Sequence, residues 1–202
     1  MPSHYCSNYS TDNSTYNNTN IGDNSDTTDG TINHTINDSN NKNIPTTLMQ
    51  LLDIITPERI ATQVHATSKK RVLETISEIF SAHSSDTLDA HQLFESLTAR
   101  ERLGTTAIDH GVAIPHGRIK DTTETIGAFV QLADGIDYDA MDQQPVNLLF
   151  ALLVPEESTE EHLQLLARLA KMFSDAELRE QLRTAPDNQA LYNMLIHWDQ
   201  TH

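Results

Sequence analysis

Two stretches in the middle of the chain carry apolar residues at the spacing of amphipathic helices. The first, residues 68–83, opens on Ser68, a residue type that caps helix N-termini. Its apolar residues share one helical face: Val72, Leu73, Ile76, Ile79 and Phe80. The second, residues 89–104, opens with Asp89 three residues before a glutamine, as in a capping box, and ends at a glycine. The pattern therefore predicts two consecutive helices.

Three short apolar segments that follow are partly β-branched and predict strands: 112–114, 126–132 and 146–154. The last of them, "VNLLFALLV", is apolar almost throughout, which is typical of a strand buried on both faces. The middle of the chain is therefore expected to form a β-sheet.

Helical spacing returns after the strands and predicts three more helices: 159–175, 175–185 and 187–198. We expect Thr159 to cap the first of them, and its inward face to consist of Leu163, Leu166, Ala170 and Phe173. Strands in the middle of a chain with helices before and after indicate an α/β fold. We therefore expect a single domain in which helices cover both faces of a sheet.

The first part of the chain differs in kind from the rest. Residues 1–45 contain no Leu, Val, Ala, Phe, Trp, Glu or Arg and consist mainly of Asn, Thr, Ser and Asp. Such a segment cannot bury enough apolar surface to offset the entropy lost on ordering it. We therefore expect residues 1–45 to be a disordered tail and residues 46–202 to form the domain.

Charge and cysteine content narrow the classes of protein to consider. The formal net charge of −16 disfavours nucleic acid as a partner, because its phosphates would be repelled, and suits a partner with a basic face. A single cysteine, Cys6, excludes a disulfide framework. The start of the chain lacks a secretory signal, and residues 146–154 fall far short of the ~20 apolar residues that span a bilayer. We expect a cytoplasmic protein that does not insert into membranes.

The motif Ile114-Pro115-His116-Gly117 specifies its backbone closely. Pro115 pushes Ile114 into the extended region, so we expect the strand to run to the proline and stop. Gly117 lacks a Cβ, which allows a sharp turn or the close approach of another group. His116 is thus presented at a strand end with space beside it. A neutral imidazole, with an ordinary pKa near ~6.5, can act as nucleophile, base or metal ligand.

Nucleophilic attack on phosphorus fits this histidine better than other kinds of chemistry. A metal would need more ligands at close spacing, and no His-x-x-x-His pair or carboxylate cluster accompanies His116. A hydrolase would need a serine or cysteine nucleophile in an elbow, and none is evident. Phosphoryl transfer needs an exposed nitrogen, a nearby cation and donors for the phosphoryl oxygens.

Four further residues are candidates for these supporting roles. Arg100, in the last turn of the second predicted helix, offers a guanidinium whose geometry matches phosphate. His162 lies in the first turn of a later helix, where anions are favoured, and the hydroxyls of Thr105 and Thr106 are possible donors. Each site residue also has an ordinary interpretation. His116 could be structural, the arginine could pair with a neighbouring glutamate, and His162 could be a surface residue.

Three long stretches carry a resemblance to a known family. They are "LTARERLGTTAIDHGVAIPHGRI" (97–119), "DYDAMDQQPVNLLFALLVP" (137–155) and "EEHLQLLARLAKMF" (160–173). They resemble the enzyme IIA domains of the fructose/mannitol class in the bacterial phosphoenolpyruvate-dependent phosphotransferase system, and within that class the nitrogen-regulatory type. The similarity runs from about residue 48 to 198, and the fold it implies is a mixed β-sheet flanked by helices.

The resemblance also implies a function and roles for the site residues. His116 would accept a phosphoryl group through its Nε2 from a histidine phosphocarrier protein. His162 would be a second active-site histidine that supports the phosphohistidine, and Arg100 would be the active-site arginine. No cofactor or metal is implied. In the nitrogen-type branch, the phosphorylation state would decide which partner proteins are bound.

Two other functions remain open at this point. One is a sugar-transport enzyme IIA that passes the phosphoryl group to the cysteine of a separate enzyme IIB. The other is a binding module that keeps the fold without carrying phosphate, against which the presence of all three site residues argues.

Overall fold

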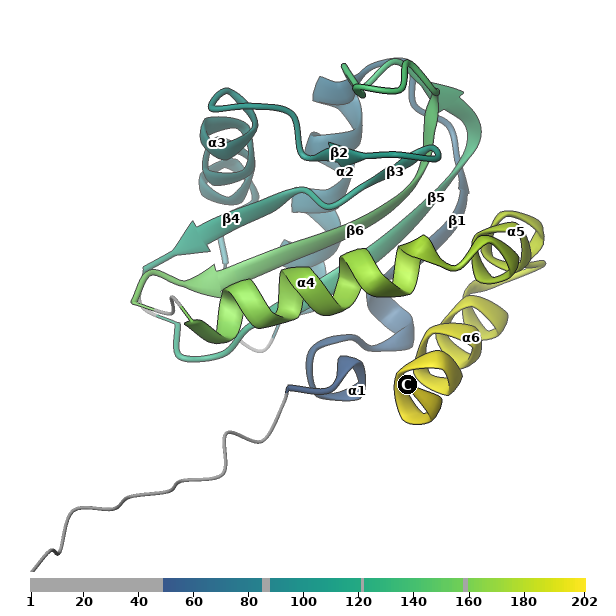
Figure 1. Cartoon of the computed structure of the whole chain (residues 1–202). Coiled ribbons are helices and arrows are strands. Elements are labelled where there is room, and N and C mark those ends of the chain that lie inside the picture. The colour runs from purple at the N-terminus through teal and green to yellow at the C-terminus, as the bar shows by residue number, and fades with distance from the viewer. Residues whose placement is uncertain (1–48, 85–87, 121, 158–159) are drawn as a thin grey trace, which may run out of the picture. The chain divides into compact units, whose positions relative to one another are not determined.

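A six-stranded mixed β-sheet forms the centre of the fold (Figure 1). The structure, a computed structural model, describes residues 49–84, 88–120, 122–157 and 160–202. Its elements in chain order are α1 (Leu51–Ile54), η1 (Pro57–Arg59), β1 (Ile60–Val64), α2 (Lys69–Ala82), α3 (Ala90–Glu101), β2 (Ala107–Ile108), β3 (Val112–Ala113), β4 (His116–Ile119), β5 (Ile126–Ile136), β6 (Val146–Pro155), α4 (Glu160–Ser174), α5 (Ala176–Thr184) and α6 (Asn188–Thr201). The predicted tail, residues 1–45, lies outside the described residues, as does the predicted cap Thr159.

Strand β6 is the central strand of the sheet. The strand order is β1-β5-β6-β3-β2, and β4 pairs with β6 further along the same edge as β3. β5 runs antiparallel to β6, whereas β3 and β4 run parallel to it. The sheet is therefore mixed, as the resemblance implied, and among the described strands β4 pairs only with β6.

The apolar composition of β6 accounts for its central place. Successive side chains of a strand point to opposite faces. Four residues of β6 enter one core cluster: Leu148, Phe150, Leu152 and Val154. Four others enter the second cluster, on the other face: Val146, Leu149, Ala151 and Leu153. The prediction of a strand buried on both faces is confirmed.

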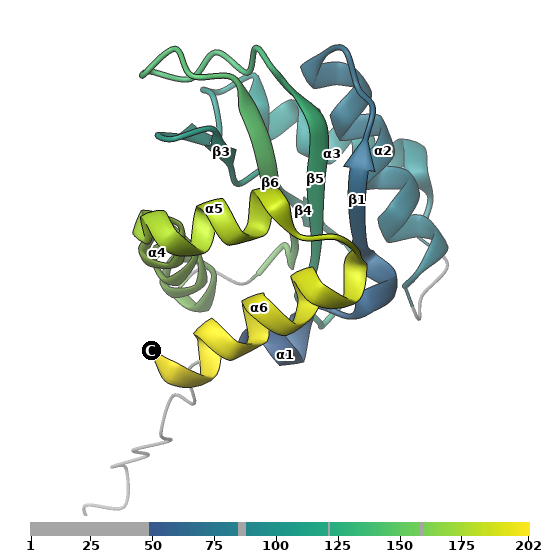
Figure 2. The ribbon, with the colours of Figure 1, turned by 90° about the vertical axis from the view of Figure 1, so that its right-hand side faces the viewer.

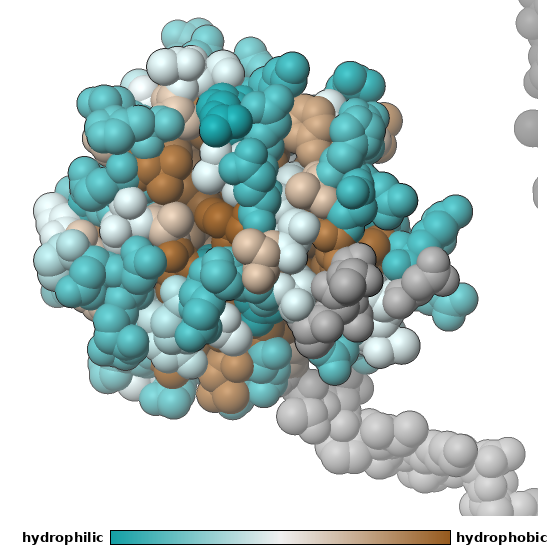
Figure 3. Space-filling model, turned by 180° about the vertical axis from the view of Figure 1, so that it is seen from behind, coloured by the Kyte–Doolittle hydropathy of each residue, from teal (hydrophilic) through white to brown (hydrophobic). Residues whose placement is uncertain are grey.

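Helices cover both faces of the sheet, as predicted. The first core cluster takes residues from α1, α4, α5 and α6, and the second takes residues from α2 and α3. Figure 2 shows these two groups on opposite sides of the strands. Seen from behind, the surface is mostly hydrophilic, with apolar side chains showing in places between polar ones (Figure 3). No helix in the described part of the chain is long and apolar enough to cross a membrane.

The predicted inward face of α4 is confirmed at Phe173, which is buried, and wrong at Leu163 and Ala170, which are exposed. Leu163 was expected inside but is 66% exposed. The buried residues are instead His162, Leu165, Leu169, Met172 and Phe173. The helix carries two overlapping apolar stripes, and packing against β6 selects the one that includes His162. This rotation turns His162 toward the sheet.

The prediction that the strand stops at Pro115 is confirmed for β3, but pairing with β6 resumes at His116. β3 ends at Ala113, but β4 begins at His116 in the same register, because Val112 pairs with Leu148 and His116 with Leu152. Proline removes only its own N–H from the ladder. The carbonyl of Pro115 still accepts a hydrogen bond from the Leu152 N–H at 2.9 Å. His116 therefore opens a second strand segment.

Gly117 allows helix α3 to pack closely against β4. A Cβ built on Gly117 would lie 2.6 Å from Oγ of Ser96 and 3.2 Å from the backbone nitrogen of Leu97. The Ser96 hydroxyl also donates to the Arg118 carbonyl at 2.7 Å. The glycine thus serves the close approach of another group, and this contact fixes α3 beside His116.

We predict that Gly117→Ala lowers the free energy of unfolding by about 1–3 kcal/mol, because the new methyl group overpacks the α3–β4 contact. Urea denaturation measures the change. The double variant Gly117→Ala, Ser96→Gly should recover part of the loss, since it removes the nearest atom but not the Leu97 backbone. An unchanged unfolding midpoint for Gly117→Ala would contradict the close approach.

Candidate functional site

The structure brings the three predicted site residues together from three elements. Nε of Arg100, in the last turn of α3, lies 2.9 Å from Nε2 of His116 at the start of β4. The rings of His116 and His162 have centroids 5.2 Å apart and are tilted by 55°. His162 comes from the first turn of α4, which follows β6 in the chain (Figure 1). His116 lies at the centre of the arrangement.

Two contacts fix the same tautomer of His116. Its Nδ1 lies 2.9 Å from the carbonyl oxygen of Ile114, which can only accept, so Nδ1 carries the proton. Arg100 Nε–H can only donate, so Nε2 must offer its lone pair. The imidazole is therefore neutral, with its nucleophilic nitrogen directed at the guanidinium.

The environment keeps both histidines uncharged at neutral pH. Burial lowers the pKa of His116, and the positive charges of Arg100 and Arg118 act in the same direction. The Ile114 carbonyl and the Glu101 carboxylate oppose this shift. Burial also lowers the pKa of His162 to about 4, with further contributions from His116 and the two arginines.

His162 is a buried residue, not the surface histidine of the ordinary interpretation. It is only 9% exposed, and its Nδ1 is buried without a hydrogen-bond partner in the described structure. A buried polar atom without a partner is unfavourable for folding alone. The ring is therefore placed where a group next to His116 could engage it.

Arg100 is not paired with a neighbouring glutamate. Its guanidinium donates to Nε2 of His116 and, through one terminal nitrogen, to the carbonyl of Gly104 at 3.1 Å. Among the described residues, no carboxylate lies within ion-pair distance of Arg100 or of Arg118. In a chain of net charge −16, two unpaired cations beside a neutral histidine favour an anion at this place.

Sequence reasoning missed Arg118. It lies two residues after His116 on β4, so both side chains project from the same face of the strand. Its guanidinium donates to the Glu156 carbonyl, in the connection between β6 and α4. The period of two along "HGR" could have revealed this cation, had the segment been identified as a strand.

The predicted roles of Thr105 and Thr106 are not supported by the structure. The Thr105 hydroxyl donates to the Tyr138 carbonyl at 2.8 Å. The Thr106 hydroxyl donates to the Glu101 carboxylate, and the residue is only 7% exposed. Both hydroxyls therefore hold the loop before β2 and do not face the histidines as free donors.

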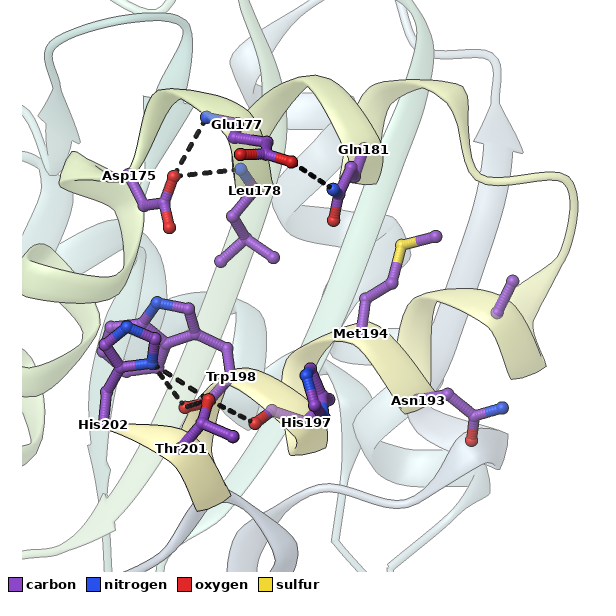
Figure 4. A pocket seen from close by; sticks show the side chains of 11 residues that line it. Asp175, Glu177, Leu178, Gln181, Asn193, Met194, His197, Trp198, Thr201 and His202 are labelled. Carbon is purple, nitrogen blue, oxygen red and sulfur yellow. Dashed lines mark hydrogen bonds between the residues drawn. The ribbon is translucent and has the colours of Figure 1, made fainter.

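The described structure also has hollows that none of the three site residues lines. A groove of about 460 Å³ lies between α5 and α6, where Trp198 and Met194 face Leu178 (Figure 4). None of the three site residues lines it. Within the described ranges, no three His, Cys, Asp or Glu side chains gather in a way that could hold a metal ion.

Comparison with known proteins gives the family. The profile of the family described as "Phosphoenolpyruvate-dependent sugar phosphotransferase system, EIIA 2" matches residues 53–198. The nitrogen regulatory protein of Pseudomonas aeruginosa is 45% identical over 149 residues, which make up 74% of this chain and 96% of that protein. The PTS system fructose-specific EIIA component of Haloferax volcanii is 34% identical over 151 residues, 73% of this chain and 97% of that protein.

The fold agrees with these sequence relationships. The crystal structure of nitrogen regulatory protein IIA-Ntr from Neisseria meningitidis superposes with a TM-score of 0.66 at 39% identity. The match covers 70% of this chain and 96% of that chain. The chain therefore belongs to the EIIA type 2 family of the phosphoenolpyruvate-dependent sugar phosphotransferase system. Within that family it is similar to the nitrogen regulatory proteins, as the sequence predicted.

We predict that His162 makes stability depend on pH between its folded pKa of about 4 and its unfolded value of ~6.5. In this window the unfolded chain binds the proton and the folded chain does not. The free energy of unfolding therefore rises with pH across this window. Between its upper and lower ends, the stabilisation lost as pH falls is about 3 kcal/mol.

Urea unfolding at several pH values measures this dependence, and His162→Gln serves as the control because glutamine does not titrate. The slope of unfolding free energy against pH should be flatter in the variant than in the wild type. Parallel slopes would show that His162 is protonated as readily in the folded protein as in the unfolded chain.

Proposed function

We propose that this protein is a phosphoryl carrier that accepts a phosphoryl group on Nε2 of His116 from a histidine phosphocarrier protein. The observation that carries the proposal is the fixed tautomer of His116, with a lone pair on Nε2 beside a guanidinium. Membership of a phosphotransferase family supports it, because the components of that system relay phosphoryl groups. The protein would act in the cytoplasm.

The transfer itself exchanges one phosphorus–nitrogen bond for another. Nε2 of His116 attacks the phosphorus of the donor phosphohistidine, in line with the bond to the donor nitrogen. The new bond forms from the Nε2 lone pair, and the donor nitrogen recovers its own pair as the old bond breaks. The Nδ1 proton stays on the ring. Its hydrogen bond to the Ile114 carbonyl stabilises the positive charge that develops there.

Arg100 and His162 would support the reaction from two sides. The Arg100 guanidinium must leave Nε2 before a phosphoryl group can bind there. It can then pair with the phosphoryl oxygens while it keeps its contact with the Gly104 carbonyl. The ring of His162 lies beside that of His116 and can donate a hydrogen bond to the same oxygens. Arg118 adds a second positive charge.

We further propose that the output is regulatory, through binding of partner proteins that depends on phosphorylation. A phosphoryl group adds strong negative charge to the site. A partner that buries unmodified His116 would then face an unpaired charge and would be released. The similarity to nitrogen regulatory proteins supports a regulatory output. The acidic chain suits donors and partners with a basic face.

A sugar-transport role is the second candidate function. The 34% identity to a fructose-specific EIIA component favours it, because the same family serves that role in another organism. The acceptor would then be the cysteine of a separate enzyme IIB. Incubation of the phosphorylated protein with enzyme IIB candidates, with capture of partners by both forms of the protein, distinguishes the two outputs.

We predict that the protein becomes stoichiometrically phosphorylated when mixed with phosphoenolpyruvate, enzyme I and the phosphocarrier protein. The label should be acid-labile and alkali-stable, as phosphohistidine is. His116→Ala should abolish it, whereas His91→Ala, a change at an exposed histidine on α3, should not. Label that persists in His116→Ala would refute the assignment of the acceptor.

We predict that Arg100→Ala slows phosphorylation on the order of 100-fold, because a donor for the developing phosphoryl charge is lost. His162→Ala should slow it by about tenfold to 150-fold, since a hydrogen bond to a charged group contributes about 1.5–3 kcal/mol. Rapid-quench kinetics measure both rates, and circular dichroism checks that the fold is retained. Wild-type rates in both folded variants would exclude these supporting roles.

A further inference from the structure

Glu101, the residue after Arg100, has a buried and fully engaged carboxylate. Its side chain is only 7% exposed. It accepts from Nζ of Lys69 at 2.9 Å and from the backbone N–H of Thr106 at 3.1 Å. It also accepts from the Thr106 hydroxyl at 2.5 Å. A buried carboxylate is unfavourable unless it is paired and hydrogen-bonded, and this one is both.

These contacts begin a continuous path of hydrogen bonds that ends on His116. Glu101 holds Thr106 by its backbone and its hydroxyl. The carbonyl of Thr106 accepts from the backbone N–H of Ile114 at 3.0 Å. The carbonyl of Ile114 accepts in turn from Nδ1 of His116. The carboxylate therefore fixes the residue that orients the imidazole.

The path closes into a ring through Arg100. Arg100 is bonded to Glu101 along the chain, and its Nε donates to Nε2 of His116. Its terminal nitrogen also holds the carbonyl of Gly104, so the loop between α3 and β2 is held at both ends. Any displacement of Glu101 would thus move the guanidinium and the imidazole relative to each other.

The ammonium of Lys69 offsets the cost of burying the Glu101 carboxylate. Its ammonium bridges Glu101 and Asp139 and lies 4.4 Å from the centre of the Tyr138 ring. Asp139 is exposed, with 79% of its side chain accessible, so Glu101 is the inner partner of the lysine. This pair anchors the end of α3 to the start of α2.

We propose that Glu101 is a positioning residue that holds Arg100 and His116 in register for phosphoryl transfer. The inference rests on the proposed function, since it concerns the same reaction. In the described structure, the hydrogen bonds of the Glu101 carboxylate go to Lys69 and Thr106 and not to either site histidine. It acts through Thr106 on one side and through the main chain on the other.

The negative charge of Glu101 has a second effect on the site. It raises the pKa of His116, against the lowering caused by burial and by Arg100 and Arg118. These charges come from α3 and β4, and His162 faces the ring from α4. Loss of the carboxylate should therefore lower the pKa of His116 further. A purely structural role would not require this shift.

Two variants of Glu101 separate the effect of its side-chain length from the effect of its charge. Asp139→Asn is the matched control, because Asp139 pairs with the same Lys69. Glu101→Gln keeps the length of the side chain and removes the charge. Glu101→Asp keeps the charge and shortens the side chain. Both should lower the maximal phosphorylation rate by on the order of tenfold to 100-fold. The phosphocarrier concentration at half-maximal rate should change little, because Glu101 is buried. Asp139→Asn should leave the rate unchanged.

Nuclear magnetic resonance tests the proposal without phosphorylation. The Nε–H signal of Arg100 should be protected from exchange in the wild type and in Asp139→Asn, and lost in both Glu101 variants. The pKa of His116 should fall in Glu101→Gln and stay close to wild type in Glu101→Asp. If the wild type is not phosphorylated on His116, the proposed function fails, whereas these signals still test the positioning role.

The opposite results would overturn the inference. Folded Glu101 variants with the wild-type maximal rate and a protected Arg100 signal would show that the carboxylate serves stability alone. If Glu101 variants do not fold, Thr106→Val removes one donor and leaves the backbone contact. Thr106→Val should reduce the maximal phosphorylation rate severalfold, with little change in the phosphocarrier concentration at half-maximal rate. A wild-type maximal rate in Thr106→Val would also contradict the proposal that Glu101 positions His116 through Thr106.

Discussion

The hydrogen bond from Nδ1 of His116 to the Ile114 carbonyl is the interaction on which the site depends. It places the single ring proton on Nδ1 and leaves the lone pair on Nε2. Ile114 lies with Pro115 in the two-residue break between β3 and β4, where its own N–H donates to the Thr106 carbonyl. A break of two residues in a well-paired strand therefore decides which nitrogen can react, and every role assigned to Arg100 and His162 follows from that choice.

Close packing makes this arrangement rigid. Gly117 lets α3 lie against β4, and the Ser96 hydroxyl ties the helix to the Arg118 carbonyl. The guanidinium of Arg100 is carried by the same helix and contacts Nε2 of His116 at the start of β4. From the other face, α4 packs on β6 and turns His162 inward. The site thus forms where two layers of helices meet at one sheet edge, and neither layer could build it alone.

The sequence predicted the elements with strong periodicity, and it failed where tertiary contacts decide. β6 was recognised because nine consecutive positions, 146–154, are nearly all apolar. β4 was missed, because a four-residue strand after a proline has no pattern of its own, and Arg118 was missed with it. α4 was found, but its two apolar stripes left the phase undecided, and the wrong choice hid the burial of His162. Only the fold brings together the contacts around Glu101: Arg100 meets His116 across 16 positions of the chain, and Lys69 meets Glu101 across 32.

The site is positively charged, whereas the chain as a whole is strongly negative. The protein has 29 acidic residues against 13 Lys and Arg, yet within the described part of the chain the carboxylate that raises the pKa of His116 is that of Glu101, which is also paired with Lys69. Two neutral rings beside two arginines that lack a carboxylate partner among the described residues are a costly arrangement for stability alone. A doubly charged phosphoryl group would satisfy the guanidinium groups and the unpartnered histidine ring at once. The folded protein therefore keeps, at one edge of its sheet, an electrostatic imbalance that the proposed phosphoryl group would relieve.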